Sequence, residues 1–237
     1  MSDGGICKEV TIYAGSLLAD PTVAHAEFTQ FFASSITKLA VNTNMVRFLI
    51  PMLVSNRLSL ENIVDLTLYA QGFPFGAESS LIPFFSHLPN VEALRIFEHP
   101  PHRWNEHPIV PETLLPKLKK FSGRPEHSGL VLSDEKRPIE WLEIEGANNL
   151  YMETIPGHLE LRTLFLSKVL WEEDCVKNLG ARFPTLESVT LYADEDDTNY
   201  VVHVCISVAL RSPISCFCLV PQRHGTIAPR PGLIAPM

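Results

Sequence analysis

The amino-acid sequence predicts an α/β solenoid of about nine irregular repeats, with a curved parallel sheet on its concave side and helices on its convex side. Three observations predict this fold class. One spacing of apolar residues recurs along the chain, its copies stand 21 to 29 residues apart, and proline precedes several of them at a similar distance. A unit of this length cannot bury its apolar face alone, so neighbouring units must stack into one continuous core.

The recurring pattern is an apolar residue, two free positions, an apolar anchor, one free position and another apolar residue. Its clearest copies are Ile63-x-x-Leu66-x-Leu68, Val91-x-x-Leu94-x-Ile96, Ile139-x-x-Leu142-x-Ile144, Leu161-x-x-Leu164-x-Leu166 and Leu186-x-x-Val189-x-Leu191. The nine anchors are Val10, Leu39, Leu66, Leu94, Phe121, Leu142, Leu164, Val189 and Phe217. The pattern and its spacing are typical of leucine-rich repeats, which run to about 20–29 residues each. The copy around Phe121 is irregular because Gly123 stands where an apolar residue belongs.

Each anchor is expected on a short strand, where it and the residue two positions later face inward because strand side chains alternate. Proline ends a helix and favours an extended entry into the next segment. The prolines four or five residues before an anchor are Pro89, Pro116, Pro138, Pro184 and Pro213.

The intervening segments are expected to supply the helices. The candidate helices are Ala24–Ser34, Asn44–Val54, Ser79–Ser86, Asp174–Arg182 and Asp197–Leu210. The acidic run Asp194–Asp197 is interpreted as a solvated loop before the last of these, because carboxylates are favourable at a helix N-terminus.

Composition limits the possible functions. The chain has 237 residues, 46% of them hydrophobic, and a net charge of −8, which argues against binding nucleic acid. It lacks an apolar run of the roughly 20 residues that a membrane helix needs. Its first residues also lack the pattern of a secretory signal. Five cysteines form no evident disulfide framework, so a cytoplasmic or nuclear location is expected.

The repeat domain is predicted over residues 1–220, followed by a Pro/Gly/Ala-rich tail over residues 221–237. Neither end shows a polar capping unit, and uncapped repeats expose apolar surface. We therefore expect the chain to be part of a longer protein or a truncated product, unless another element caps it.

Few residues suggest chemistry. His99, His102 and His107 could hold zinc, but their spacing matches no known motif and favours an exposed loop. Cys216-x-Cys218 pairs two thiols without a second pair nearby, which favours ordinary strand residues. Since nucleophile-elbow and phosphate-binding patterns are missing too, no enzyme activity and no cofactor is expected.

The concave face is the predicted functional surface. The free strand positions point there, and aromatic and arginine side chains are the types that most often anchor protein interfaces. The same aromatics could instead serve cross-strand packing. The predicted contact residues are Tyr69, Arg95, Phe97, Trp141, Glu143, Phe165 and Tyr192.

Three segments carry a family resemblance. The stretches Leu88–Leu94, Leu115–Phe121 and Phe183–Val189 place an apolar residue and proline just before a strand, and resemble the repeats of fungal F-box proteins, especially the mushroom-type families. The resemblance implies that the repeats recruit the substrate of a ubiquitin ligase, while a preceding F-box binds a Skp1-type adaptor. No F-box-like pattern precedes the first strand, so a Skp1 contact is expected only if such a segment lies upstream. The alternatives are a scaffold or regulatory repeat protein without a ubiquitin role, and a truncated repeat fragment.

Overall fold

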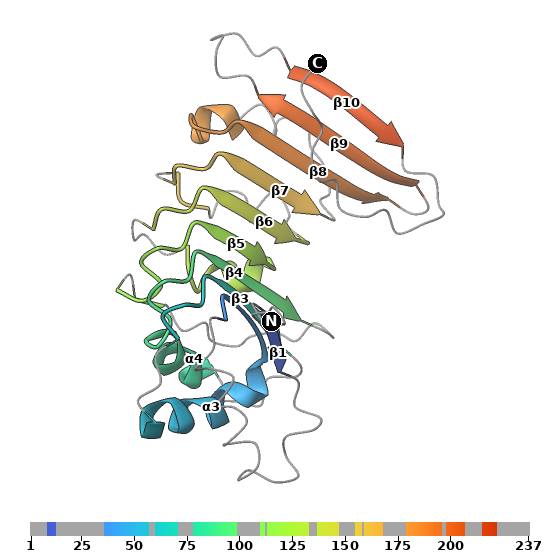
Figure 1. Ribbon diagram of the computed structural model, residues 1–237. Helices are drawn as coiled ribbons and strands as arrows, with labels where there is room; N and C mark the ends of the chain where they lie inside the picture. Colours follow the sequence, from blue (N-terminus) through green and yellow to red (C-terminus); the bar gives the residue numbers. More distant parts are fainter. Residues whose placement is uncertain are drawn as a thin grey trace, which may run out of the picture.

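The computed structural model describes residues 9–12, 36–56, 60–70, 78–98, 110–111, 113–132, 137–146, 155–157, 159–167, 179–195, 198–206 and 215–221. Within these residues, ten strands form one sheet in which the order of strands follows the order of the chain (Figure 1). The strands are β1 Glu9–Ile12, β2 Lys38–Asn42, β3 Asp65–Ala70, β4 Ala93–Glu98, β5 Lys120–Gly123, β6 Trp141–Glu145, β7 Thr163–Ser167, β8 Ser188–Glu195, β9 Thr198–Ile206 and β10 Ser215–Pro221.

Strands β1 to β8 are all parallel, and their register matches the anchors read from the sequence. Val10 pairs with Leu39, Leu39 with Leu66, and the row continues without a slip through Leu142 and Leu164 to Val189. From Leu39 onward every anchor in this row is at most 1% exposed. The parallel α/β arrangement is confirmed, and it is compatible with a leucine-rich repeat solenoid.

A short turn precedes several strands and explains the prolines. In four units a carbonyl accepts the backbone N–H three residues later, as in a β-turn; the pairs are Leu60–Ile63, Leu88–Val91, Leu115–Leu118 and Phe183–Leu186. Pro89, Pro116 and Pro184 occupy the second position of three of these turns, where their restricted φ is already suitable. The turn stops the preceding segment and directs the chain into the next strand.

The helices contribute to the same core as the anchors. The structure describes helices α3 Thr43–Asn56, α4 Glu78–Phe85 and α5 Pro125–Ser128, and a helical turn over residues 179–182. Val46, Leu49 and Leu53 of α3 are buried in one cluster with Leu81, Phe84 and Phe85 of α4 and with the strand anchors. Figure 1 places α3 and α4 together beside the first strands.

The helices predicted at Asn44–Val54 and Ser79–Ser86 are confirmed as α3 and α4. Of the helix predicted at Asp174–Arg182, residues 179–182 are described and are helical. Ala24–Ser34 lies outside the described residues.

The helix prediction for Asp197–Leu210 is wrong, because this segment contains strand β9. Glu195 of β8 pairs with Thr198 of β9 in antiparallel fashion, so two residues connect the strands and no crossover helix fits. Valine-rich β9 has the β-branched composition of a strand. Asp194 and Glu195 of the acidic run thus lie on β8, and a strand, not a helix, follows the run.

The ninth predicted unit does not continue the parallel sheet as expected. Phe217 lies on β10, which pairs antiparallel with β9, so the parallel series has eight strands instead of nine. Pro221 belongs to β10, although it is the first residue of the predicted tail; residues 222–237 lie outside the described part.

In the irregular fifth copy, a residue from outside the repeat pattern fills the space beside Gly123. A Cβ at Gly123 would lie 3.0 Å from Cζ of Phe121 and 3.3 Å from Nδ1 of His127. His127 is 0% exposed, and its Nδ1 accepts the backbone N–H of Arg124 at 3.3 Å. The imidazole on α5 therefore occupies the space that an apolar strand residue fills in the other copies.

A buried arginine ties together the segments behind β5 and β6. Arg137 is 4% exposed. Its guanidinium donates to the carbonyls of Val131 at 2.8 Å, Val110 at 2.5 Å and Pro111 at 2.8 Å. Buried backbone carbonyls need partners, and here one side chain serves the buried carbonyls of Val131 and Val110 and also bonds to that of Pro111.

Candidate functional site

The open face of the sheet is the surface formed by the strand positions that alternate with the buried anchors. On β6, Trp141, Glu143 and Glu145 are partly exposed, whereas Leu142 and Ile144 between them are fully buried. The same alternation holds on β7, where Phe165 is partly exposed. This alternation of faces was predicted from the sequence and is confirmed on both strands.

An aromatic pair stands at the carboxyl ends of two neighbouring strands. Tyr69 on β3 is in register with Phe97 on β4, and their rings stack with centroids 5.8 Å apart and an interplanar angle of 22°. Phe97 is 43% exposed, which is unusual for a large apolar side chain in an otherwise well-buried set. Stacking holds the ring in one orientation while leaving much of it open.

Two of the predicted contact residues are bonded to neighbours on the same face. Arg95 Nη2 on β4 lies 3.3 Å from Asp65 Oδ2 on β3, and the Asp65 side chain is 16% exposed. Ser122 Oγ on β5 donates to Glu143 Oε2 on β6 at 2.7 Å. Cross-strand pairs of this kind stabilise the sheet. Arg95 and Glu143 therefore help to hold the shape of the open face, whatever else they contact.

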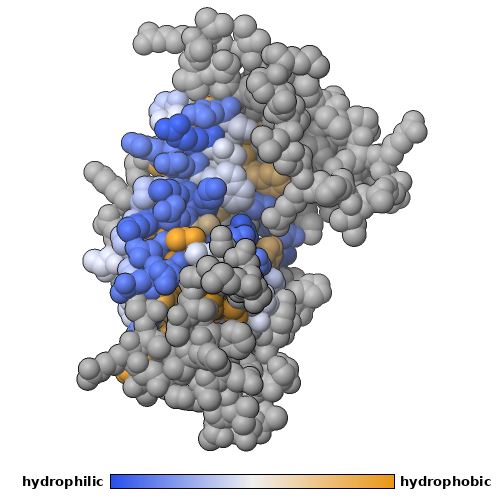
Figure 2. Space-filling model, in the orientation of Figure 1, coloured by the Kyte–Doolittle hydropathy of each residue, from blue (hydrophilic) through white to orange (hydrophobic). Residues whose placement is uncertain are grey.

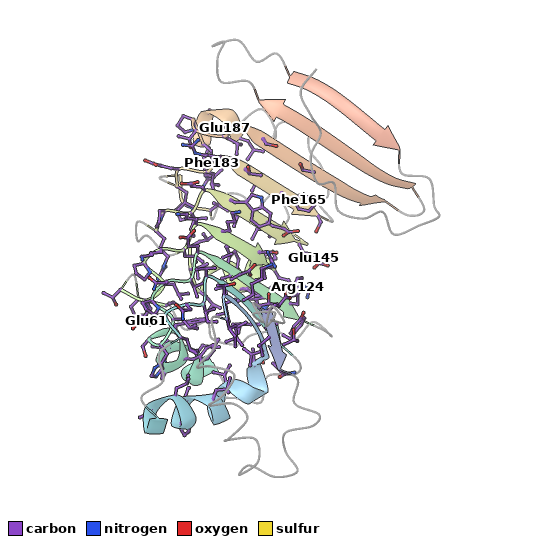
Figure 3. All side chains as sticks on the ribbon, in the orientation of Figure 1. Glu61, Arg124, Glu145, Phe165, Phe183 and Glu187 are labelled. Atoms are coloured by element: carbon purple, nitrogen blue, oxygen red, sulfur yellow. The ribbon has the colours of Figure 1, made fainter. Side chains whose placement is uncertain are left out.

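Trp141 and Phe165 extend the face towards β7. Trp141 is in register with Thr163, and Phe165 is in register with Glu143. In Figure 3, Phe165, Glu145 and Arg124 lie along the side of the sheet where the strands end, while Glu61, Phe183 and Glu187 lie along the side where they begin.

The structure thus gathers Tyr69, Arg95, Phe97, Trp141, Glu143 and Phe165 on one face of β3 to β7. Tyr192 pairs with Ser167 through the backbone of β8, and its side chain lies outside the described part. The predicted contact residues do not include Lys120 and Arg124 of the fifth unit. Lys120 occupies the same pattern position as Trp141. Arg124 comes three residues after the Phe121 anchor.

A second polar surface follows the edge where the strands begin. The residues two positions before the anchors alternate in charge from β4 to β8; they are Glu92, Lys119, Glu140, Arg162 and Glu187. Lys119 Nζ lies 3.2 Å from Glu92 Oε2, and Arg162 Nη1 lies 3.0 Å from Glu187 Oε1. Figure 2 shows the corresponding hydrophilic band along the left side. All four side chains are at least 44% exposed, so these ion pairs contribute little stability.

The sites considered for metal chemistry remain predictions. His99, His102 and His107 lie outside the described residues, and so do the side chains of Cys216 and Cys218. In the part of the chain that the structure describes, no group of three or more His, Cys, Asp or Glu is placed to hold a metal ion. None of the helices in that part has the length and apolar character that a membrane crossing requires.

Comparison with known proteins adds no family. The sequence matches no protein-family model, and searches of curated proteins and of solved structures find no similar chain. What the fold defines is an α/β protein whose eight parallel strands stack in chain order, consistent with a repeat solenoid.

Proposed function

We propose that the chain is a leucine-rich repeat module that binds a protein partner inside the cell through the open face of its sheet. The observation that carries the proposal is the stacked pair of Tyr69 and Phe97, in which Phe97 is 43% exposed. Buried aromatic contacts supply much of the energy of protein interfaces. Because the pair is already stacked, a partner that covers it has little side-chain freedom left to remove.

The surrounding face supports this function through its rigidity. The ion pair of Arg95 with Asp65 joins β4 to β3. The hydrogen bond of Ser122 with Glu143 joins β5 to β6. Polar groups that are held in place beforehand can contact a partner without a large ordering cost. Trp141 and Phe165 add partly exposed aromatic area on the next two strands.

The resemblance to fungal F-box proteins favours a specific use of such a face, namely substrate recruitment for a ubiquitin ligase. That role requires an F-box segment in the same polypeptide and a Skp1-type adaptor bound to it. The alternative is a scaffold or regulatory protein with the same face and no ligase. Immunoprecipitation of the native protein separates the two, because the ligase role predicts Skp1 and cullin among the recovered proteins.

The binding face is tested by crosslinking in cells. Benzoylphenylalanine in place of Phe97 should form a covalent adduct with a partner under ultraviolet light. Val54 on α3 is 60% exposed and offers a matched control position away from the open face. A discrete adduct from position 97 and none from position 54 is the expected result. Equal adducts from both positions, or an adduct from position 54 alone, would contradict the proposal.

A further inference from the structure

We infer that the last two strands of the sheet carry a zinc site made of one histidine and three cysteines. The four residues are His203 and Cys205 of β9 and Cys216 and Cys218 of β10. They lie beyond strands β3 to β7, which carry the proposed partner contacts. Their side chains lie outside the described part of the structure, so the site is inferred from the backbone pairing of the two strands.

The pairing of β9 with β10 brings the four residues to adjacent register positions. Cys216 is directly opposite Cys205, and Cys218 is directly opposite His203, in an antiparallel pair. Residues that are opposite each other, and residues two positions apart on one strand, share a face of the sheet. The four residues therefore form a block of two by two on one face. The second pair of metal-binding residues that Cys216-x-Cys218 lacks in the nearby sequence is supplied by β9.

The block occupies the face opposite the anchors. The residue between its two members on β9 is Val204, which pairs with Val189, the 0% exposed anchor of β8. The residue between its two members on β10 is Phe217, which pairs in turn with Val204. The anchor row thus continues in apolar residues, while the metal-binding types fall on the alternate positions. Three of the chain's five cysteines belong to this block, so a cysteine-rich composition does not explain the grouping.

The residue types and spacing of the block suit one zinc ion. Opposite residues of an antiparallel pair have Cβ atoms about 4.5–5.5 Å apart, and diagonal neighbours are about 7–8 Å apart. Zinc in structural sites takes four ligands in a tetrahedron, with sulfur at about 2.3 Å and imidazole nitrogen at about 2.0–2.1 Å. Three cysteines with one histidine are an established ligand set for such sites, and soft thiolates select against magnesium and calcium. One diagonal of the block contains the histidine, whose ring reaches further than a thiol.

A zinc ion shared by β9 and β10 fastens the last strand to the sheet just after the parallel series ends. The end units of a solenoid need a cap because their outer side lacks a neighbour. Metal that binds only the folded state adds its binding free energy to the stability of that state. The site therefore serves as a clip that stabilises the antiparallel end of the sheet.

The test uses the full chain, purified under reducing conditions, stripped of metal with a chelator and titrated with Co²⁺ and then with Zn²⁺. Co²⁺ should bind in equimolar amount and give the visible absorption of a tetrahedral site together with a cobalt–thiolate charge-transfer band, and Zn²⁺ should displace it. Cys205→Ser and Cys216→Ser should each lower the affinity for Zn²⁺ about 100-fold or more, because the loss of even an outer-shell partner costs about 10–100-fold. His203→Asn should weaken binding but keep the cobalt–thiolate band.

Cys175→Ser is the matched control, because it removes a thiol that belongs to neither strand. It should leave the cobalt spectrum and the affinity for Zn²⁺ unchanged. Circular dichroism of the metal-free variants should match that of the metal-free native chain, so that a lost affinity reports a lost ligand. A native chain that gives no cobalt–thiolate band would overturn the site. Equal losses of affinity in Cys175→Ser and Cys216→Ser, or an unchanged affinity in Cys205→Ser, would overturn it as well.

Discussion

Gly123 and His127 should behave as one unit in stability measurements. The backbone φ of Gly123 is not positive. The cost of adding a side chain there is therefore steric and not conformational. In Gly123→Ala the new Cβ would stand 3.0 Å from Phe121 Cζ, 3.3 Å from His127 Nδ1 and 3.4 Å from His127 Cβ. Phe121 and His127 are each 0% exposed and have little room to move. Overpacking of this kind costs about 1–3 kcal/mol.

His127→Ala should be destabilising for a different reason. It opens a cavity beneath β5 and removes the acceptor of the Arg124 backbone N–H. The lost packing and hydrogen bond together should cost about 2–4 kcal/mol. In this background Gly123→Ala no longer meets the imidazole and adds a methyl group to an under-filled space. The double variant should therefore be more stable than the sum of the single changes predicts, with a coupling energy of about 1–2 kcal/mol.

The assay is urea unfolding followed by circular dichroism for the native chain, both single variants and the double variant. Gly180→Ala is the control, because a Cβ at Gly180 would meet no atom within 4 Å. Within a helical turn it should be neutral or stabilising by about 0.4–1 kcal/mol. Additivity of the two changes to within about 0.5 kcal/mol would refute the idea that His127 fills the place of the missing strand residue.

Three further changes test other parts of the structure. Leu164→Asp places a charge at a 0% exposed anchor and should unfold the parallel units, which a normal melting curve would contradict. Arg137→Met leaves the buried carbonyls of Val131 and Val110 without this donor and should cost about 3 kcal/mol, with faster amide exchange around Val131; native-like exchange there would disprove the role. Arg162→Gln removes an exposed pair with Glu187 and should lower the free energy of unfolding by less than about 1 kcal/mol in thermal melts, and a larger loss would mean that the edge is structurally important.

The predicted face was recoverable from sequence because strand alternation is a local property. Once Leu94 and Leu142 were assigned to the core, the positions of Arg95 and Trp141 on the other face followed. Their partners did not follow, since the contact of Arg95 with Asp65 spans 30 residues. The exposure of Phe97 likewise depends on which side chains flank it on β3 and β5.

The sequence by itself determined the units, the anchors and their register from Val10 to Val189. Parallel strands that stack in order must align their apolar residues, so the spacing of the pattern already contains the pairing. Tertiary structure alone decided three matters. Pairing with β8 made Thr198–Ile206 a strand, where unit spacing had suggested a helix. His127 filled the space left by Gly123. Arg137 satisfied carbonyls up to 27 residues away. In each case the deciding contact involves residues that do not belong to the repeated apolar pattern. The spacing of that pattern therefore could not show the contact.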